Sequence, residues 1–437
     1  MNSFGQHLKK FLVENVRDYA MFVALIAIMI VFEVLSGGTF LSPDNITNLI
    51  NQTGYLAVLS IGVTLVIVIR HIDLSIGFLS GFLGAVAANL MMFYHFNAFT
   101  AILVVLLLGA LAGLLNGSMV AYLGIPSFIA TLAGWMAYRG ALLLATRGMG
   151  TIIIKNETFN AIGNGYIPDI PGLENFLPGY HKLTLLLGIV AIIAIIYSSI
   201  SGRRRQIQRG IEPIPFDMFI LEMVFITAGL LYITLKIAAY NGISWTLLIV
   251  LAVTMIYYFI TERTVLGRHI YAVGGNPEAA QLSGINVKKI ILIVFTSMGM
   301  LAGLSGILFA SRLKSATTTA GTMFELYAIA GAYIGGVSAA GGVGKVVNSL
   351  IGAFVMQTLQ NGMLLLGVDV SLQYIILGVV LAIAVIFGRS YTFSGALNQS
   401  ILEVKTRRHR PRGRGAPPGR PGPAAPPAGA RAAAIAA

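Results

Sequence analysis

Long apolar runs separated by short polar segments dominate this sequence between residues 19 and 387. A helix needs about 20 apolar residues to cross the hydrocarbon core of a bilayer, which is roughly 30 Å thick. The pattern predicts an all-α, polytopic transmembrane helical bundle of about ten to twelve spans, the lower counts applying if a segment is re-entrant. The expected helices are Tyr19–Leu35, Gly54–Ile69, Ile76–Phe93, Thr100–Tyr122, Phe128–Ala145, Leu183–Ile200, Phe216–Ile237, Ile243–Ile260, Ile290–Ser311, Phe324–Ala340, Val346–Leu366 and Leu372–Phe387.

Composition supports a membrane protein. Hydrophobic residues make up 57% of the 437 residues and charged residues only 10%, whereas a soluble domain carries about 25% charged residues. The chain has no cysteine, which excludes disulfides and thiolate metal sites. His71 stands beside Asp73 with no further ligands evident, so we expect no metal and no cofactor.

Basic residues flank the apolar runs, and this distribution predicts the orientation. With an even number of spans and both termini in the cytoplasm, nearly all the basic clusters face the cytoplasm, as the positive-inside rule requires. Arg312 and Lys314 are the exceptions. We therefore expect a multi-pass protein of the bacterial inner (cytoplasmic) membrane, and the net charge of +13 does not indicate a nucleic-acid partner. The clusters are Lys9 and Lys10, Arg203 to Arg205, Arg263 and Arg268, Lys288 and Lys289, Lys345, and the tail.

Three regions follow from these patterns. Residues 1–18 are expected to be a cytoplasmic N-terminal segment and residues 19–390 the transmembrane domain. Residues 391–437 are rich in Pro, Gly, Ala and Arg. Such a composition cannot bury a core, so we expect a disordered cytoplasmic tail.

The polar loop at residues 264–289 contains a short helix with both of its ends marked. Asn276 is a good N-cap, Pro277 suits the first helical position and Glu278 complements the positive end of the helix dipole. Gly284 is a natural terminator. A helix of two turns is marginal alone, so it either docks against a partner protein or simply connects two spans.

Polar residues inside or beside the apolar runs are candidates for a substrate pathway. Ionisable groups in a membrane span cost at least about 2.5 kcal/mol in insertion assays and often line pathways. We consider Asp73, Ser75, Asn116, Glu325 and Asn361 as such candidates. Arg70 stands three residues before Asp73, so the two side chains could pair on one helical face. Interhelical hydrogen bonding is the alternative explanation for the two amides.

Small residues repeat at a spacing of four in several runs, for example Gly109 and Gly113, and Gly299 and Gly303. This spacing lets helix backbones approach closely. Packing within one chain is the favoured interpretation, and a dimer seam is the alternative.

The chain lacks the motifs of an ATPase or a hydrolase. Val346 follows Gly344-Lys345 and no glycine stands five residues before Gly344, so the phosphate-binding loop pattern fails. No Gly-x-Ser-x-Gly motif or catalytic dyad is evident either. We expect the protein not to be an enzyme and to depend on another source of energy.

Four blocks of the sequence, in order, resemble one family of proteins. The segment from Gly267 to Val287 resembles the EAA-type coupling loop of ABC importer permeases, in the branch that serves ribose, galactose, xylose and arabinose. Residues 70–77, 126–140 and 324–344 resemble the Asp-Leu-Ser-Val-Gly, Pro-Ser-Phe-Ile and Glu-Leu-x-Ala-Ile-Ala blocks of that branch. The resemblance covers about residues 45–387, and the insert at about residues 201–237 looks like the larger xylose and multiple-monosaccharide permeases. Tyr333 and the tail beyond Ser400 depart from the family.

The resemblance implies a bundle similar to type II ABC importers and a permease subunit that moves a monosaccharide, xylose or several monosaccharides, into the cytoplasm. It implies a second permease copy, most simply as a homodimer, together with cytoplasmic ATP-binding subunits that hydrolyse ATP and a periplasmic or lipid-anchored sugar-binding protein. The ATPase-coupling residues would be Gly267, Asn276, Pro277, Glu278, Ala279, Ala280 and Gly284. Two alternatives are a secondary carrier driven by an ion gradient, in which Asp73 and Glu325 would serve, and a membrane scaffold that transports nothing.

Overall fold

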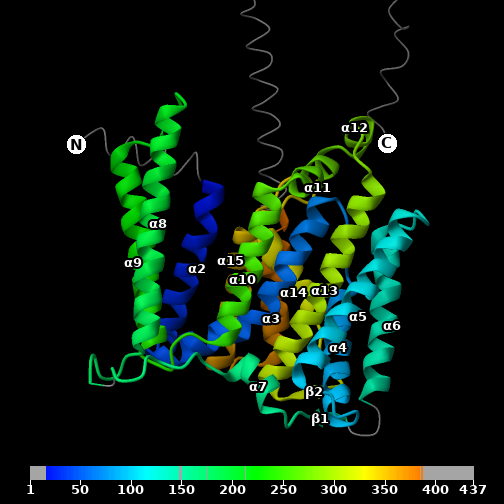
Figure 1. Cartoon of the computed structure of the whole chain (residues 1–437), viewed down its shortest axis with the longest axis horizontal. Coiled ribbons are helices and arrows are strands. Elements are labelled where there is room, and N and C mark those ends of the chain that lie inside the picture. Colours follow the sequence, from blue (N-terminus) through cyan, green and yellow to red (C-terminus); the bar gives the residue numbers. More distant parts are fainter. Residues whose placement is uncertain (1–15, 147–149, 174, 212, 384, 387–437) are drawn as a thin grey trace, which may run out of the picture. The chain divides into compact units, whose positions relative to one another are not determined.

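The computed structural model describes residues 16–386, apart from residues 147–149, 174, 212 and 384. The predicted tail at 391–437 and most of the N-terminal segment lie outside the described residues. The described part is helical except for two short antiparallel strands, β1 (Thr151–Ile153) and β2 (Ser315–Thr317) (Figure 1). The helices are α2 (Val16–Leu35), α3 (Pro43–Val68), α4 (Ile76–Met92), α5 (Ala98–Ala121), α6 (Ser127–Ala145), α7 (Glu157–Asn164), α8 (Lys182–Gln208), α9 (Phe216–Ala238), α10 (Trp245–Arg263), α11 (Val265–Gly275), α12 (Pro277–Leu282), α13 (Val287–Leu313), α14 (Phe324–Ile334), α15 (Val346–Leu365) and Val370–Ile383.

The predicted all-α fold is confirmed, since each apolar run forms a helix. Within the described residues, seven helices are both long enough and apolar enough to cross a membrane. Four other apolar helices are shorter there, among them α4 and α14. The remaining one, α15, has 20 residues but carries several side-chain amides, which lower its hydropathy.

Three helix boundaries differ from the prediction by six residues or more, one of them the end of α8 at Gln208 rather than Ile200. α14 ends at Ile334 rather than Ala340, because a glycine-rich turn follows in which Gly336 and Gly341 have positive φ angles. α3 begins at Pro43, well before the expected Gly54. Its first turns are polar, so hydropathy did not reveal them, and Pro43 at the first helical position favours a start there.

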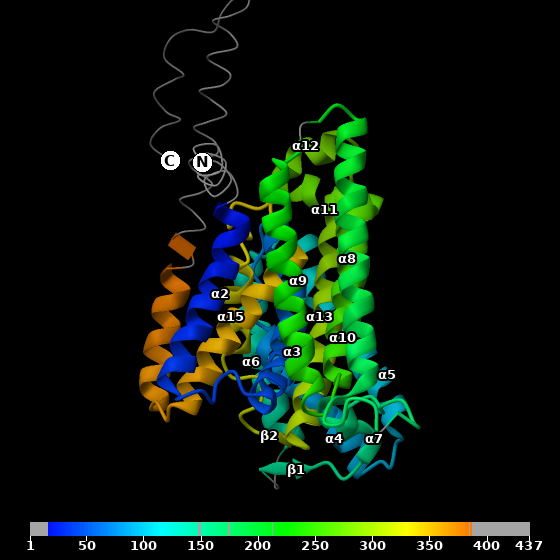
Figure 2. The same cartoon turned by 90° about the vertical axis from the view of Figure 1, so that its left-hand side faces the viewer.

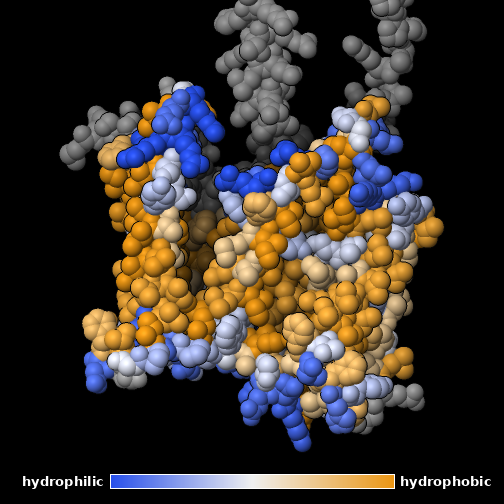
Figure 3. Space-filling model, viewed as in Figure 1, coloured by the Kyte–Doolittle hydropathy of each residue, from blue (hydrophilic) through white to orange (hydrophobic). Residues whose placement is uncertain are grey.

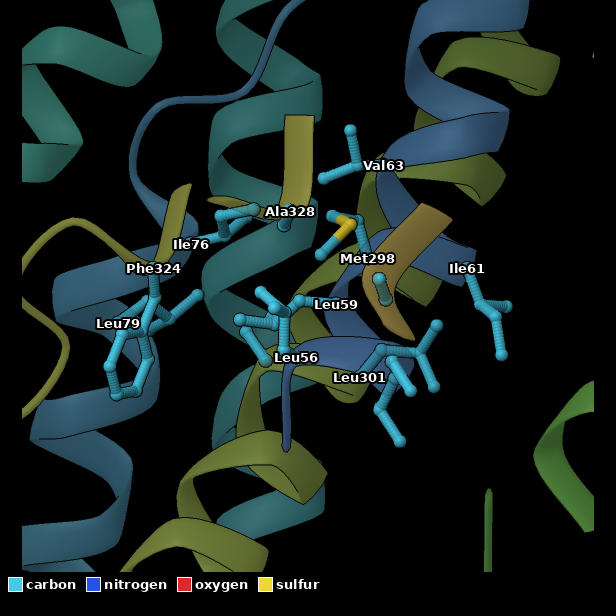
Figure 4. Close-up of a cluster of buried hydrophobic side chains, with 14 of the residues drawn as sticks. Leu56, Leu59, Ile61, Val63, Ile76, Leu79, Met298, Leu301, Phe324 and Ala328 are labelled. Atoms are coloured by element: carbon cyan, nitrogen blue, oxygen red, sulfur yellow. The ribbon is translucent and has the colours of Figure 1, made fainter. Parts of the chain in front are cut away.

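α3 is the central helix of the bundle (Figures 1 and 2). In its most apolar stretch, 83% of the residues are buried. It packs against α13, α14 and α15, and α13 in turn packs against α4 and α5. Figure 4 shows Leu56 and Leu59 of α3 beside Leu301 of α13 and Phe324 of α14, all of them buried. This core fixes the helices that carry the polar residues described below.

Small residues bring the central helices into close contact. A Cβ atom on Gly299 of α13 would lie 2.1 Å from the carbonyl oxygen of Gly109 of α5, and one on Gly352 of α15 would lie 1.9 Å from that of Gly331 of α14. Neither position has room for a larger residue. These glycines therefore serve packing within one chain, as the favoured interpretation of their spacing predicted.

Hydrophobic residues form a band across the visible face, between two hydrophilic rims (Figure 3). One rim lies over α11, α12 and the last turns of α8, and the other lies over α7 and the two strands (Figures 1 and 3). The band is the surface expected of a protein with lipid around its middle.

Candidate functional site

A cavity of about 600 Å³ lies among the helix ends nearest α7. It is bounded by the first turns of α3, the last turns of α13 and α15, the end of α7 and the helix Val370–Ile383. Its size falls within the range of small-molecule sites, about 300–1,000 Å³. The lining residues are Asn48, Gln52, Tyr55, Asn164, Phe309, Arg312, Leu313, Gln357, Gln360, Asn361, Leu364 and Gln373.

Seven of these twelve residues carry side-chain amides, an unusual lining for a cavity between apolar helices. Asn361 Nδ2 donates to Asn45 Oδ1 (3.2 Å) and to Gln52 Oε1 (3.3 Å), and Asn45 Nδ2 donates to Asn361 Oδ1 (3.1 Å). This amide pair joins α15 to α3. The sequence pattern indicated Asn361 as a pathway candidate, and the structure places it on the wall of the cavity.

Two other amides on the wall have atoms without a hydrogen-bond partner. Oε1 of Gln357 and Nε2 of Gln360 are buried and unpaired, and the residue Gln357 is only 5% exposed. An unpaired buried polar group costs about 1–3 kcal/mol. Such groups on a cavity wall favour a ligand that both donates and accepts hydrogen bonds.

Arg312 contributes a positive charge to the same cavity. Its guanidinium donates to Asn164 Oδ1 (3.0 Å) and to Asn48 Oδ1. Among the described residues, no carboxylate forms an ion pair with Arg312. The guanidinium is therefore held by neutral oxygens. Two aromatic rings, those of Tyr55 and Phe309, lie on the same wall with their centroids 5.1 Å apart.

Sequence reasoning missed every lining residue except Asn361, although a signal for them was present. Gln357, Gln360 and Asn361 recur at helical spacing within one otherwise apolar run. Asn48 and Gln52 are four residues apart just before the predicted start of the second span. Amides at such spacing share one helical face, and two such faces predict a polar interior.

Three of the other predicted pathway residues form one buried network away from the cavity. Oδ1 of Asp73 accepts hydrogen bonds from the backbone N–H (2.9 Å) and the hydroxyl (2.6 Å) of Ser75. Asn116 Nδ2 donates to the Ser75 hydroxyl (2.8 Å). An aspartate that bonds the residue two positions on forms an Asx turn. Here the turn sets the start of α4 and ties it to α5.

Glu325 lies on the first turn of α14 and is 5% exposed. Trp135 Nε1 donates to its Oε1 (3.1 Å), while its Oε2 is buried and unpaired. A Cβ atom on Gly77 would lie 1.9 Å from that Oε2. The five predicted pathway residues therefore occupy three places: the Asp73 network, the Glu325 contact and the cavity wall at Asn361.

The predicted short helix is present as α12 at the rim opposite the cavity (Figures 1 and 2). Oδ1 of Asn276 accepts from the N–H of Ala279 (3.0 Å), Pro277 is the first helical residue, and Gly284 has φ +84°. These contacts confirm the predicted caps. Glu278 and Ala279 are exposed, and Ala280 is 4% exposed because it packs inside its own chain.

Gly267 and Leu282 complete the description of this loop. Gly267 is buried near the start of α11, where a Cβ atom would lie 2.3 Å from the carbonyl oxygen of Thr261. Leu282 on α12 is 90% exposed. Of the coupling residues that the resemblance implies, Ala280 is thus buried, whereas Leu282, which the sequence analysis did not single out, presents a large apolar side chain on α12.

Arg70 does not pair with Asp73, contrary to the sequence-based expectation. It has φ +65°, which turns its side chain toward α11. Its Nε donates to the carbonyl oxygen of Gly274 (2.7 Å) and its Nη2 to that of Gly275. These bonds satisfy carbonyls at the C-terminal end of α11, where a positive charge is favourable.

Two further contacts connect α11 to α3 through the loop after α14. Tyr271 donates its hydroxyl to the carbonyl oxygen of Gly344 (2.6 Å), and the N–H of Gly342 donates to the carbonyl oxygen of Val68 (2.8 Å). Burial, with the Glu262 carboxylate nearby, raises the pKa of Tyr271 to about 12. Tyr271 therefore remains a hydrogen-bond donor at neutral pH. We call α11 and α12 with these contacts the tethered loop.

A membrane bundle with a polar cavity at one rim and a tethered loop at the other defines a membrane permease. Residues 45–385 match the family model described as branched-chain amino acid transport system / permease component, and the chain belongs to this family.

Named relatives cover more than four fifths of the chain. It is 38% identical over 374 residues to the xylose transport system permease protein XylH of Haemophilus influenzae, covering 85% of this chain and 96% of the relative. It is 37% identical to XylH of Escherichia coli K12, covering 85% and 91%. It is 33% identical to the ribose import permease protein RbsC of Escherichia coli K12, covering 83% and 92%. No solved structure matches the chain significantly. Like these relatives, the chain is a permease component and not itself an enzyme.

Proposed function

We propose that this chain is the membrane-spanning subunit of an ATP-driven importer that moves a monosaccharide, xylose or a closely related sugar, into the cytoplasm. Its identity to two xylose permeases exceeds that to the ribose permease. It lies in the bacterial inner membrane with both termini in the cytoplasm, and works as a homodimer. Its partners are cytoplasmic ATP-binding subunits and a periplasmic or lipid-anchored sugar-binding protein.

One observation supports ATP-driven transport most directly: the tethered loop offers an exposed helix end to a partner. Leu282 is almost fully exposed on α12, while Ala280 two residues earlier is buried against α13 and its surroundings. Arg70 and Tyr271 connect α11 to the end of α3 and to the loop after α14. A displacement of α12 by a bound partner would therefore be transmitted to the central helices through these hydrogen bonds.

Coupling can be tested at Leu282 in the complete transporter. Burying a leucine contributes about 1.5–3 kcal/mol, so Leu282→Asp should weaken ATPase docking about tenfold or more. Sugar-stimulated ATP hydrolysis and sugar uptake should fall together, while Leu282→Met retains both. The membrane bundle should stay intact, because the side chain touches no core. Unchanged hydrolysis and uptake in Leu282→Asp would show that α12 is only a connector.

A further inference from the structure

The cavity among α3, α13 and α15 has features that a simple path for a substrate does not require. Its wall carries amides fixed in place, a guanidinium, two aromatic rings and two buried amide atoms without partners. A water-filled passage needs only a polar surface. We infer that this cavity is a binding site for a neutral monosaccharide, so that the permease itself recognises the sugar after its release from the binding protein. This inference rests on the proposed function.

The unpaired atoms fit hydroxyl groups. Gln357 offers an acceptor, Oε1, and Gln360 a donor, Nε2, from positions three residues apart on α15. Such positions lie on the same helical face. A sugar hydroxyl both donates and accepts, so one ring with adjacent hydroxyls can satisfy both amides.

The remaining wall fits a sugar better than a branched-chain amino acid. Asn361 and Asn45 hold each other, and Asn164 and Asn48 hold Arg312, so the wall is fixed before a ligand arrives. Among the described lining residues none is acidic, so no carboxylate is present to pair with an ammonium group. An aliphatic side chain would also leave the amides of α15 unpaired, which is costly.

The absence of native cysteine makes a protection experiment direct. Gln373 lines the cavity, and Ser371 is exposed outside it at the start of the same helix. In full-length protein in nanodiscs, D-xylose should slow maleimide labelling of Gln373→Cys. It should not slow labelling of Ser371→Cys, and L-leucine should protect neither. Equal protection at both positions, protection by L-leucine, or no protection by D-xylose would overturn the inference.

Substitutions of the amides on α15 provide the second part of the protection experiment. In the Gln373→Cys background, Gln357→Leu and Gln360→Leu should each raise the protecting xylose concentration about tenfold, since each loses a hydrogen bond to the ligand. Thr358→Val is the matched control: its hydroxyl is also buried and unpaired on α15, but it does not line the cavity. It should behave as the parent. If Gln357→Leu fails to fold, the less buried Gln360 carries the test.

Unchanged protection in both leucine variants would overturn the inference even if uptake by the complete transporter is normal. A different result would contradict the proposed function: wild-type protein, assembled with its ATPase subunits and binding protein, would take up no monosaccharide. The two failures are therefore distinguishable.

Discussion

Gly274 and Gly275 are adjacent at the end of α11, yet the space around them differs. A Cβ atom on Gly274 would lie 1.9 Å from the carbonyl oxygen of Val68 and 2.8 Å from the backbone nitrogen of Gly342. A Cβ atom on Gly275 would meet nothing within 4 Å. The neighbours of Gly274 are backbone atoms, which no rotamer change can move. The size of one residue thus determines how closely the tethered loop approaches α3.

This difference gives a matched pair of substitutions. Gly274→Ala should force α11 away from the end of α3, at a cost of about 1–3 kcal/mol for overpacking, and should strongly reduce sugar-stimulated ATP hydrolysis. Gly275→Ala should leave it close to the wild-type rate. Hydrolysis by purified transporter at saturating sugar and binding protein measures both. Equal rates in the two variants would contradict the tether between α11 and α3.

At the scale of elements, hydropathy predicted the helices well because most of them face lipid or one another. It predicted least well where polar residues are buried. The first turns of α3 carry Asn45 and Asn48, and α15 carries Gln357 and Asn361. These residues find partners or line a cavity that arises only when five helices meet.

Only the local features of the candidate site could be predicted from the sequence. The caps of α12 are local, so Asn276 and Gly284 could be assigned from the sequence. The bonds from Arg70 to Gly274 and Gly275 join parts of the chain some 200 residues apart. The burial of Ala280 depends on tertiary packing against α13. A pairing of Arg70 with Asp73 seemed natural from spacing, but the positive φ of Arg70 sends the side chain elsewhere.

At the scale of the whole molecule, the helix α8 separates two polar regions. It has 27 residues and so extends about 40 Å. The segment before it lies near the rim that carries α7, and its last turns lie at the rim that carries α11 and α12 (Figures 1 and 2). Arg203, Arg204 and Arg205 stand on those last turns, and the orientation we propose from the positive-inside rule puts them in the cytoplasm.

Single cysteines test this orientation. Asn175 and Gln206 are both exposed, one before α8 and one on its last turn. In intact cells, a membrane-impermeant maleimide should label Asn175→Cys and should label Gln206→Cys only after permeabilisation. The cysteine-free parent provides the background. The reverse pattern would invert the proposed topology, and labelling of both in intact cells would show that α8 does not span the membrane.

The most direct test of the account is to ask what drives transport. The wild-type protein, reconstituted in liposomes with its ATP-binding subunits and sugar-binding protein, should accumulate D-xylose only when the ATP-binding subunits are supplied with hydrolysable ATP. Uptake should persist after ionophores abolish proton and sodium gradients. Xylose accumulation that needs no ATP and collapses with those gradients would contradict the account and identify the protein as a secondary carrier.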